Sequence, residues 1–340
     1  MGTRTGLFLQ MNDYQPGMIK NKACRNSLIY CSSDQFPKTE DLLPTLEAII
    51  KETHESESSM ILQLSKRIST LNDLKDLEEL AFGLDVDYLH LDHSWPAEEV
   101  RELALRLPVA VSVSNLTLPE RYWFRNNCPN VLFIHDYYTR KDTGLDQNVF
   151  DDLSEGISRE DLVVFVPGNP VEERKGNEPS TLEHHRTMTP YAASLDLMNQ
   201  GVGGIIYTSF EIGDMEKQMI DKATQGVYGL PVSLNHPELY HQTFTIRSDS
   251  PKKLRRLLEI PQGIQMPVNP DVPVARRPGF ITMDNLHFPD SQGSLMICNG
   301  DFQADPCVNV IGHVCDYYLP IIELLENGAC IEFIHPNLHG

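Results

Sequence analysis

Eight short apolar segments, most of them followed by polar residues and separated by about the length of one helix, occupy the first two thirds of this sequence. Most are near-continuous runs of Val, Ile, Leu, Tyr and Phe, as expected of parallel strands whose two faces are both buried. Eight such strands predict a closed (β/α)8 TIM barrel, in which the chemistry lies at the carboxyl ends of the strands. The predicted strands are Gly6–Met11, Ser27–Cys31, Met60–Leu64, Val86–Leu91, Val109–Val113, Val131–His135, Leu162–Val166 and Gly204–Tyr207.

The chain is longer than a barrel alone requires. It has 340 residues, whereas a barrel typically needs about 250, and past about Gly226 the spacing of apolar residues changes. One helix over Tyr318–Glu326 and several strands are predicted there: Thr243–Ile246, Gly279–Met283, Ser294–Ile297, Val308–Ile311 and Cys330–Ile334. We therefore expect an α/β chain with a TIM barrel in residues 1–228 and a small, mostly-β domain in residues 229–340. The segment 14–22 contains Pro16 and Gly17 and predicts a short first helix.

Composition excludes several classes of partner. The formal net charge of -20 opposes binding to nucleic acid and to anionic membranes. No apolar stretch approaches the roughly 20 residues that span a bilayer, and the start of the chain lacks the features of a signal peptide. Seven cysteines without a C-x-x-C pair favour a reducing compartment. We expect a soluble cytoplasmic protein that needs no cofactor, and the sequence leaves open whether it forms a homo-oligomer.

The fourth predicted strand ends in His90-Leu-Asp92-His93. Residues 90 and 92 share one face of the strand because side chains alternate. If that face is inward, Asp92 is a candidate acid, base or nucleophile. An Asp that caps the strand-to-helix turn would look the same.

The loop after the sixth strand concentrates polar and aromatic side chains. It contains an imidazole, a carboxylate, phenols and a guanidinium, a mixture suited to a sugar with an anionic substituent, although a polar loop with buried tyrosines would have a similar composition. The candidate substrate-binding residues are His135, Asp136, Tyr138 and Arg140.

The loops after the seventh and eighth strands carry further candidates. Glu183 and Arg186 lie on adjacent helical turns, so the guanidinium can hold either the glutamate or an anionic ligand. The pair His184 and His185 raises a metal site, but neither H-x-H nor H-E-x-x-H occurs and we expect no metal. Ser209 and Asp214 follow the eighth strand, where this fold commonly binds phosphate.

Two carboxylates that face each other across an anomeric carbon are the minimum apparatus of most glycosidases. Asp92 and Glu183 are the leading pair, and Asp136 and Asp214 are rivals. Sequence spacing does not establish which two meet.

These loops resemble a bacterial family associated with 6-phospho-N-acetylmuramidase activity. The family pattern H-N-F-Y-P-R-P-x-T-G-L aligns with residues 135–145 and shares His135, Tyr138, Arg140, Thr143, Gly144 and Leu145. The pattern P-T-L-E-x-H-R aligns with residues 180–186 and shares Thr181, Leu182, Glu183, His185 and Arg186. Met283-Asp284-Asn285 and Val308-Asn309-Val310-Ile311-Gly312 are similar to the family's D-N and V-N-V-x-G elements.

The resemblance implies a barrel followed by a cyclophilin-like domain, and cytoplasmic hydrolysis of a disaccharide phosphate in cell-wall recycling. It makes Arg140, Arg186 and Arg247 the cations expected to face the lactyl and phosphate groups of the substrate. The sequence departs from the family at four positions: Asp136 replaces Asn, Thr139 and Lys141 replace prolines, and His90 replaces Arg. Two alternatives therefore stay open, a sugar-phosphate-binding protein without catalysis and a metal-dependent hydrolase.

Overall fold

The computed structural model describes residues 2–22, 26–32, 42–64, 74–92, 95–174 and 177–336. It divides into two compact units, Met1–Ile212 and Gly213–Gly340. The sequence-based boundary between residues 228 and 229 remains a prediction. In the described part of the chain, none of the helices has the length and apolar composition required to cross a lipid bilayer.

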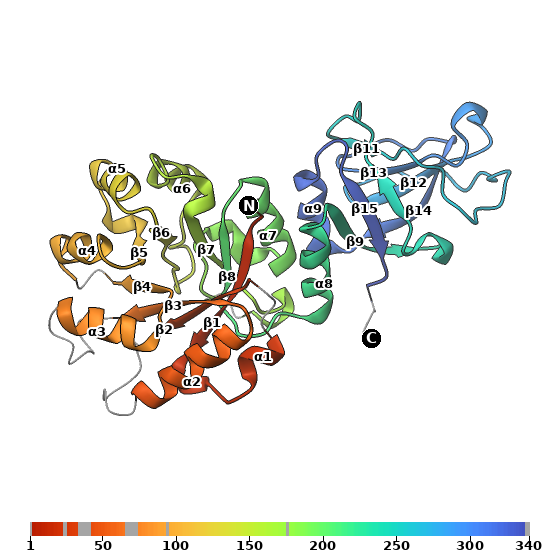
Figure 1. Cartoon of the computed structure of the whole chain (residues 1–340). Coiled ribbons are helices and arrows are strands. Elements are labelled where there is room, and N and C mark those ends of the chain that lie inside the picture. The colour runs from red at the N-terminus through yellow and green to blue at the C-terminus, as the bar shows by residue number, and fades with distance from the viewer. Residues whose placement is uncertain are drawn as a thin grey trace. The chain divides into compact units, whose positions relative to one another are not determined.

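The first unit is a closed barrel of eight parallel strands in chain order, as the sequence predicts (Figure 1). The predicted strand ends differ from the observed ones by no more than two residues. The strands are β1 (Arg4–Gln10), β2 (Leu28–Ser32), β3 (Ser59–Leu64), β4 (Tyr88–Leu91), β5 (Val109–Ser112), β6 (Leu132–His135), β7 (Leu162–Val166) and β8 (Gly204–Tyr207).

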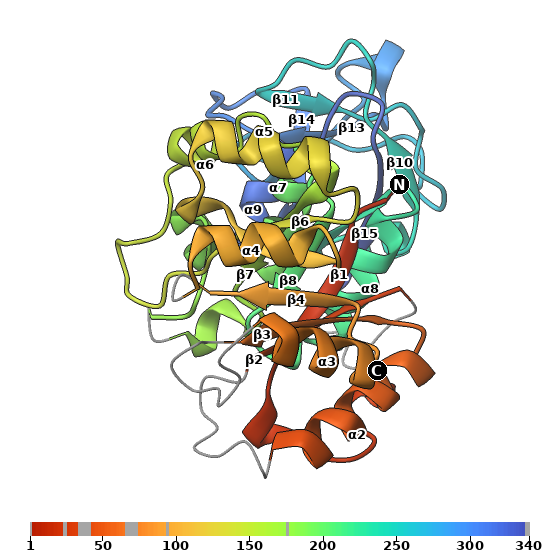
Figure 2. The ribbon, with the colours of Figure 1, turned by 60° about the vertical axis from the view of Figure 1, so that its left-hand side comes forward.

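Helices cover the outside of this barrel, and Figure 2 shows α3, α4 and α5 following one another along its wall. The first helix is a single short turn, as predicted, and α7 begins at Pro190 because the Thr189 hydroxyl accepts a hydrogen bond from the Ala192 N–H. The helices are α1 (Met18–Lys22), α2 (Leu42–Glu55), α3 (Leu74–Leu84), α4 (Ala97–Ala104), α5 (Leu118–Asn127), α6 (Gln147–Leu153) and α7 (Pro190–Asn199).

Alternate residues of each strand fill the barrel interior. Leu132 and Ile134 of β6 belong to the interior cluster, together with Tyr30 of β2 and Phe165 of β7. Ala110 of β5 belongs to the same cluster. Because side chains alternate, the inward positions of β5 and β6 continue to residues 112 and 136 at the carboxyl ends of these strands. The polar residues that follow the strands are therefore aimed into the barrel mouth.

The second unit is a seven-stranded, mostly antiparallel sheet in the order β10-β15-β9-β14-β12-β13-β11, in which only β9 and β15 pair in parallel among the described strands. Its edge strands β10 and β11 are joined by an Ile246–Leu257 bridge, so the sheet curls onto itself. Its elements are α8 (Asp214–Ala223), β9 (Val227–Leu234), β10 (Thr243–Thr245), β11 (Leu254–Arg256), β12 (Phe280–Asp284), β13 (Leu295–Cys298), β14 (Val308–Val314), α9 (Leu319–Leu324) and β15 (Cys330–Ile334).

Two strands of this unit, β9 and β11, were not predicted from the sequence. Strand β9 contains Gly229 and Pro231, which are rare in central strands, and β11 has only three residues, two of them arginines. The cyclophilin-like assignment of this unit remains an expectation from the family resemblance.

Candidate active site at the barrel mouth

A chain of hydrogen bonds leads from the barrel interior to its mouth. The Tyr30 hydroxyl lies 2.8 Å from His90 Nδ1, and His90 Nε2 lies 3.0 Å from Ser112 Oγ. Ser112 Oγ in turn donates to Asp136 Oδ1 over 2.8 Å. Tyr30, His90 and Ser112 are all buried. We call these three residues with Asp136 the interior chain.

The three hydrogen bonds that link the interior chain are consistent with one arrangement of protons. Since the Ser112 hydroxyl donates to Asp136, it accepts from His90, which places the imidazole proton on Nε2. His90 Nδ1 is then free of a proton and accepts from the Tyr30 hydroxyl. In these three hydrogen bonds each group donates to the next one along the chain toward Asp136. The second carboxylate oxygen of Asp136 accepts from the Ser114 hydroxyl over 2.8 Å. The interior chain therefore holds a carboxylate at the mouth through neutral hydroxyl donors.

Tyr138 and Arg140 lie beyond Asp136 on the same loop. Burial raises the pKa of the Tyr138 phenol, and the negative charge of Asp136 raises it further. Tyr138 is therefore a neutral hydroxyl close to the Asp136 carboxylate. The Arg140 side chain is exposed, and within the described residues its guanidinium has no hydrogen-bond or ion-pair partner. This cation is available to an anionic ligand.

Glu183 and Arg186 bind each other. Arg186 Nε lies 2.9 Å from both carboxylate oxygens of Glu183, and these oxygens also accept from the N–H groups of Asp142 (2.9 Å) and Gly144 (2.7 Å). Burial by itself raises the pKa of Glu183, but these hydrogen bonds outweigh it and the pKa lies below its usual value. We call the Glu183–Arg186 pair the loop clamp, because it joins the loop after β6 to the loop after β7.

The terminal nitrogens of Arg186 donate to backbone carbonyls of both loops. One terminal nitrogen donates to the carbonyl of Glu178, and the other donates to the carbonyls of Tyr138 (2.7 Å) and Arg140 (3.0 Å). Arg186 is buried, and four of its five N–H groups donate to acceptors of the protein. Its substrate-binding role remains a prediction. Glu183, held ionised by several donors, is poorly suited to be a general acid.

Gly144 is part of the loop clamp for a steric reason. A Cβ atom at this position would lie 2.6 Å from Glu183 Oε2 and 2.9 Å from its backbone nitrogen. Only glycine allows the two loops to approach so closely. Gly144, Glu183 and Arg186, which the chain shares with the two family patterns, therefore hold the two loops together.

Two further candidates, His135 and Arg247, occupy positions that differ from those expected. His135 faces outward from β6, because Leu132 and Ile134 on the opposite face of the strand fill the interior. Its Nε2 atom lies 2.9 Å from Ser154 Oγ. Burial and then the charges of Arg159 and Arg121 lower its pKa to about 3, so it is a neutral core histidine. Arg247 belongs to the second unit and is paired with Asp249 over 2.9 Å.

The other candidates are placed as follows. Asp92 is half-buried directly after β4, on the face of the strand that carries His90, and His93 lies outside the described residues. Ser209 Oγ donates to the Glu211 carbonyl over 2.6 Å in the loop after β8. Asp214 is the exposed first residue of α8 in the second unit. Asp92 and Glu183 follow β4 and β7, so β5 and β6 lie between them.

Tyr30, Ser112 and Ser114 were not predicted from the sequence. The alternation of β5 contained the signal for Ser112, because residues 110 and 112 share one face, whereas Ser114 lies in the 3-10 helix Val113–Asn115 that follows the strand. Tyr30 has no comparable signal, since a tyrosine in an apolar strand is usually a core residue.

Family models match both parts of the chain. The model described as "6-phospho-N-acetylmuramidase, N-terminal" matches residues 11–223, and "6-phospho-N-acetylmuramidase, C-terminal" matches residues 232–334. The chain belongs to the 6-phospho-N-acetylmuramidase family. The family resemblance seen in the loop patterns is thereby confirmed.

Solved structures agree with this family fold. A conserved protein of unknown function from Enterococcus faecalis superposes with a TM-score of 0.83 at 20% identity, covering 98% of this chain and 97% of that one. An uncharacterized B. cereus protein superposes with a TM-score of 0.74 at 16% identity, covering 98% and 100%. At these identities the likeness extends to the fold alone. No curated protein matches the sequence.

Proposed function

We propose that this protein is a glycosidase that cleaves a phosphorylated muramic acid disaccharide during cell-wall recycling in the cytoplasm. The observation that carries the proposal is the match of both family models, which together span nearly the whole chain. The products would be N-acetylglucosamine and N-acetylmuramic acid 6-phosphate, as the family resemblance implies.

Arg140 is the cation that we assign to the substrate's phosphate or lactyl group. Its exposed guanidinium has no partner among the described residues, whereas Arg186 and Arg247 are each engaged with a carboxylate. A planar guanidinium can bind a phosphate or carboxylate through two parallel hydrogen bonds. In a chain with a net charge of -20, one available arginine at the mouth gives the site its local attraction for an anion.

Asp92 and Asp136 are the carboxylates that we assign to the glycosidic bond, in place of Asp92 and Glu183. Both follow strands at inward-facing positions, and only β5 separates β4 from β6. Adjacent strands lie about 4.8 Å apart, so the two strand ends are separated by about 10 Å before the side chains converge. This spacing suits two carboxylates with a sugar between them. The donors to Asp136 are serine hydroxyls, which do not neutralise its negative charge, so the carboxylate can act on the glycosidic bond. The charge of Glu183 is neutralised by the Arg186 guanidinium.

The test is hydrolysis of N-acetylmuramic acid 6-phosphate linked to N-acetylglucosamine, with sugar release measured for the wild type, Asp92→Asn, Asp136→Asn and Glu183→Gln. We expect a loss of 100-fold or more for either aspartate variant, in line with the usual contribution of general acid–base groups. Asp151→Asn, an exposed acid on α6 paired with Arg159, is the matched control and should retain wild-type activity.

Asp136→Asn is the most informative variant because it restores the residue usual in the family. An inactive wild type with an active Asp136→Asn variant would overturn the assignment of Asp136. An inactive wild type and equally inactive variants would overturn the glycosidase proposal.

A second candidate is a binding protein that retains the sugar-phosphate pocket without catalysis. The observation that favours it is the commitment of Glu183 and Arg186 to each other, together with the added negative charge of Asp136. Calorimetry with N-acetylmuramic acid 6-phosphate distinguishes the candidates. Tight binding without turnover supports the second candidate, and the absence of binding excludes it.

A further inference from the structure

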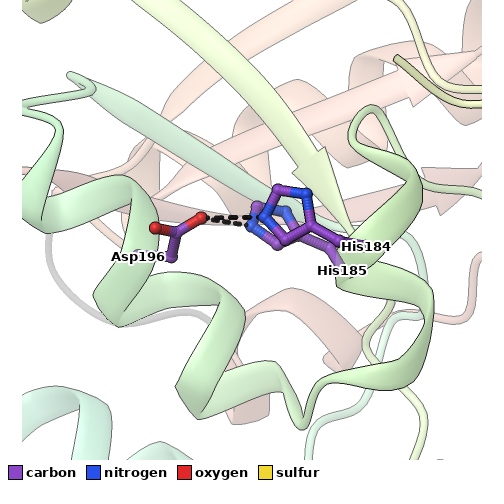
Figure 3. Close-up of side chains that lie close together, drawn as sticks. All are labelled: His184, His185 and Asp196. Carbon is purple, nitrogen blue, oxygen red and sulfur yellow. Dashed lines mark hydrogen bonds and ion pairs between the residues drawn. The ribbon is translucent and has the colours of Figure 1, made fainter. Parts of the chain in front are cut away.

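Two adjacent histidines and one aspartate converge outside the barrel mouth. His184 and His185 lie in the 3-10 helix η6 (Glu183–Thr187), and Asp196 lies on α7, which packs against β7 and β8. Figure 3 shows both imidazole rings directed at the same carboxylate. His184 Nε2 lies 3.1 Å and His185 Nε2 lies 2.9 Å from Asp196 Oδ2.

These distances are close to those between ligands of one metal ion. The candidate ligand atoms all lie within 4.8 Å of one another. Ligand atoms in a tetrahedral zinc site are about 3.3 Å apart when each bond is about 2.0–2.1 Å long. Only small movements of the three side chains would therefore be needed to admit an ion between them.

The charge of the cluster also suits a cation. Burial lowers the pKa of the fully buried His185, so its imidazole is neutral and able to act as a ligand. Burial by itself raises the pKa of Asp196, but the hydrogen bonds from His184 and His185 lower it well below its usual value. The carboxylate is therefore ionised and supplies a negative charge for a cation. His184 is 39% exposed, which gives an ion a route of entry from solvent.

We propose that His184, His185 and Asp196 bind one divalent transition-metal ion, with zinc as the expected metal. Two imidazoles and one carboxylate are a common zinc ligand set, and water would complete the coordination on the exposed side of His184. The ion would join η6 to α7. Since η6 begins with Glu183 and contains Arg186, the metal would stabilise the loop clamp rather than take part in sugar hydrolysis.

One feature of His185 limits the affinity of this site. Its Nδ1 atom is buried and has no hydrogen-bond partner. Coordination through Nε2 moves the imidazole proton to Nδ1, where a zinc site normally provides an acceptor. We therefore expect binding about 10–100-fold weaker than at a site whose outer shell is complete.

The experiment uses the full chain after removal of metal with a chelator. Zn²⁺ is titrated by calorimetry, and Co²⁺ is titrated by visible absorption, which reports the coordination geometry. We expect one ion per chain, and a loss of at least tenfold in affinity for His184→Gln and Asp196→Asn. Zn²⁺ should also raise the Tm of the wild type and leave that of His184→Gln unchanged.

His236→Gln is the matched control. His236 also lies 3.1 Å from a carboxylate, that of Glu238, but it belongs to the second unit and is not part of this cluster. It should bind Zn²⁺ as the wild type does. Circular dichroism establishes that each variant is folded; His184 is the preferred position because its half-exposed side chain can be replaced with little loss of packing.

Failure of the wild type to bind either ion stoichiometrically would overturn the proposal. Wild-type affinity in a folded His184→Gln variant would overturn it as well. Neither result depends on glycosidase activity, so the outcome is independent of the proposed function.

Discussion

The interior chain and the loop clamp both place a carboxylate after a barrel strand, but their donors differ. Asp136 accepts from the hydroxyls of Ser112 and Ser114. Glu183 accepts from the guanidinium of Arg186 and from two backbone N–H groups. Charged donors bind a carboxylate about twice as strongly as neutral ones. The Glu183 carboxylate of the loop clamp is therefore held in a structural ion pair. The Asp136 carboxylate of the interior chain has no charged donor among the described residues and is the better candidate for catalysis.

The largest expected effect comes from removing the cation of the loop clamp. Arg186→Ala leaves Glu183 without its guanidinium partner and removes one donor each from the carbonyls of Glu178, Tyr138 and Arg140. Breaking a buried ion pair in this way costs about 3–5 kcal/mol of unfolding free energy. Tryptophan fluorescence in urea measures it, because both tryptophans, Trp95 and Trp123, lie in the barrel unit.

Arg106→Ala is the matched control for that measurement. Arg106 lies in the barrel unit, is exposed and is paired with Glu78 and Glu102, so its removal should leave the unfolding midpoint unchanged within error. Equal effects of the two variants would break the distinction between the loop clamp and an ordinary surface ion pair.

A smaller effect is expected in the interior chain. Ser112→Ala removes the hydroxyl that accepts from buried His90 Nε2 and donates to Asp136, which should cost about 1–3 kcal/mol. Ser114→Ala removes the other donor to Asp136, but it is exposed and should cost less. Urea unfolding followed by tryptophan fluorescence compares the two. If Ser114→Ala were the more destabilising, the continuity of the interior chain would be refuted.

The smallest expected effect is in the pH dependence of the loop clamp. Because the folded-state pKa of Glu183 lies below its usual value of 4.5, its contribution to stability is present above that pH and is lost as the pH falls through the folded-state pKa. The difference in unfolding free energy between the wild type and Glu183→Gln should therefore be constant near pH 6–7 and shrink below about pH 4.5. A difference that grew on acidification would contradict the ionised state of Glu183.

Much of the fold was predictable from local sequence. The barrel strands are continuous apolar runs, and Thr189 with Pro190 marks the start of α7. The second unit was harder to predict because β9 contains Gly229 and Pro231. The polar loops that follow the strands were located from the sequence, but the contacts that their residues make were not, and the roles of these residues remain predictions. His135, for example, is shared with the family and faces the core.

The sequence by itself determined the regular spacing of the eight barrel strands, the strongly negative net charge and the positions of the loops that are rich in polar residues. Only the tertiary structure decided which carboxylate is held by a guanidinium and which by hydroxyls. The physical reason is that a carboxylate takes its properties from donors within about 3 Å. Ser112, which donates to Asp136, lies 24 residues from it in the sequence. Gly144, which donates to Glu183, lies 39 residues from it. Closure of the barrel brings such positions together.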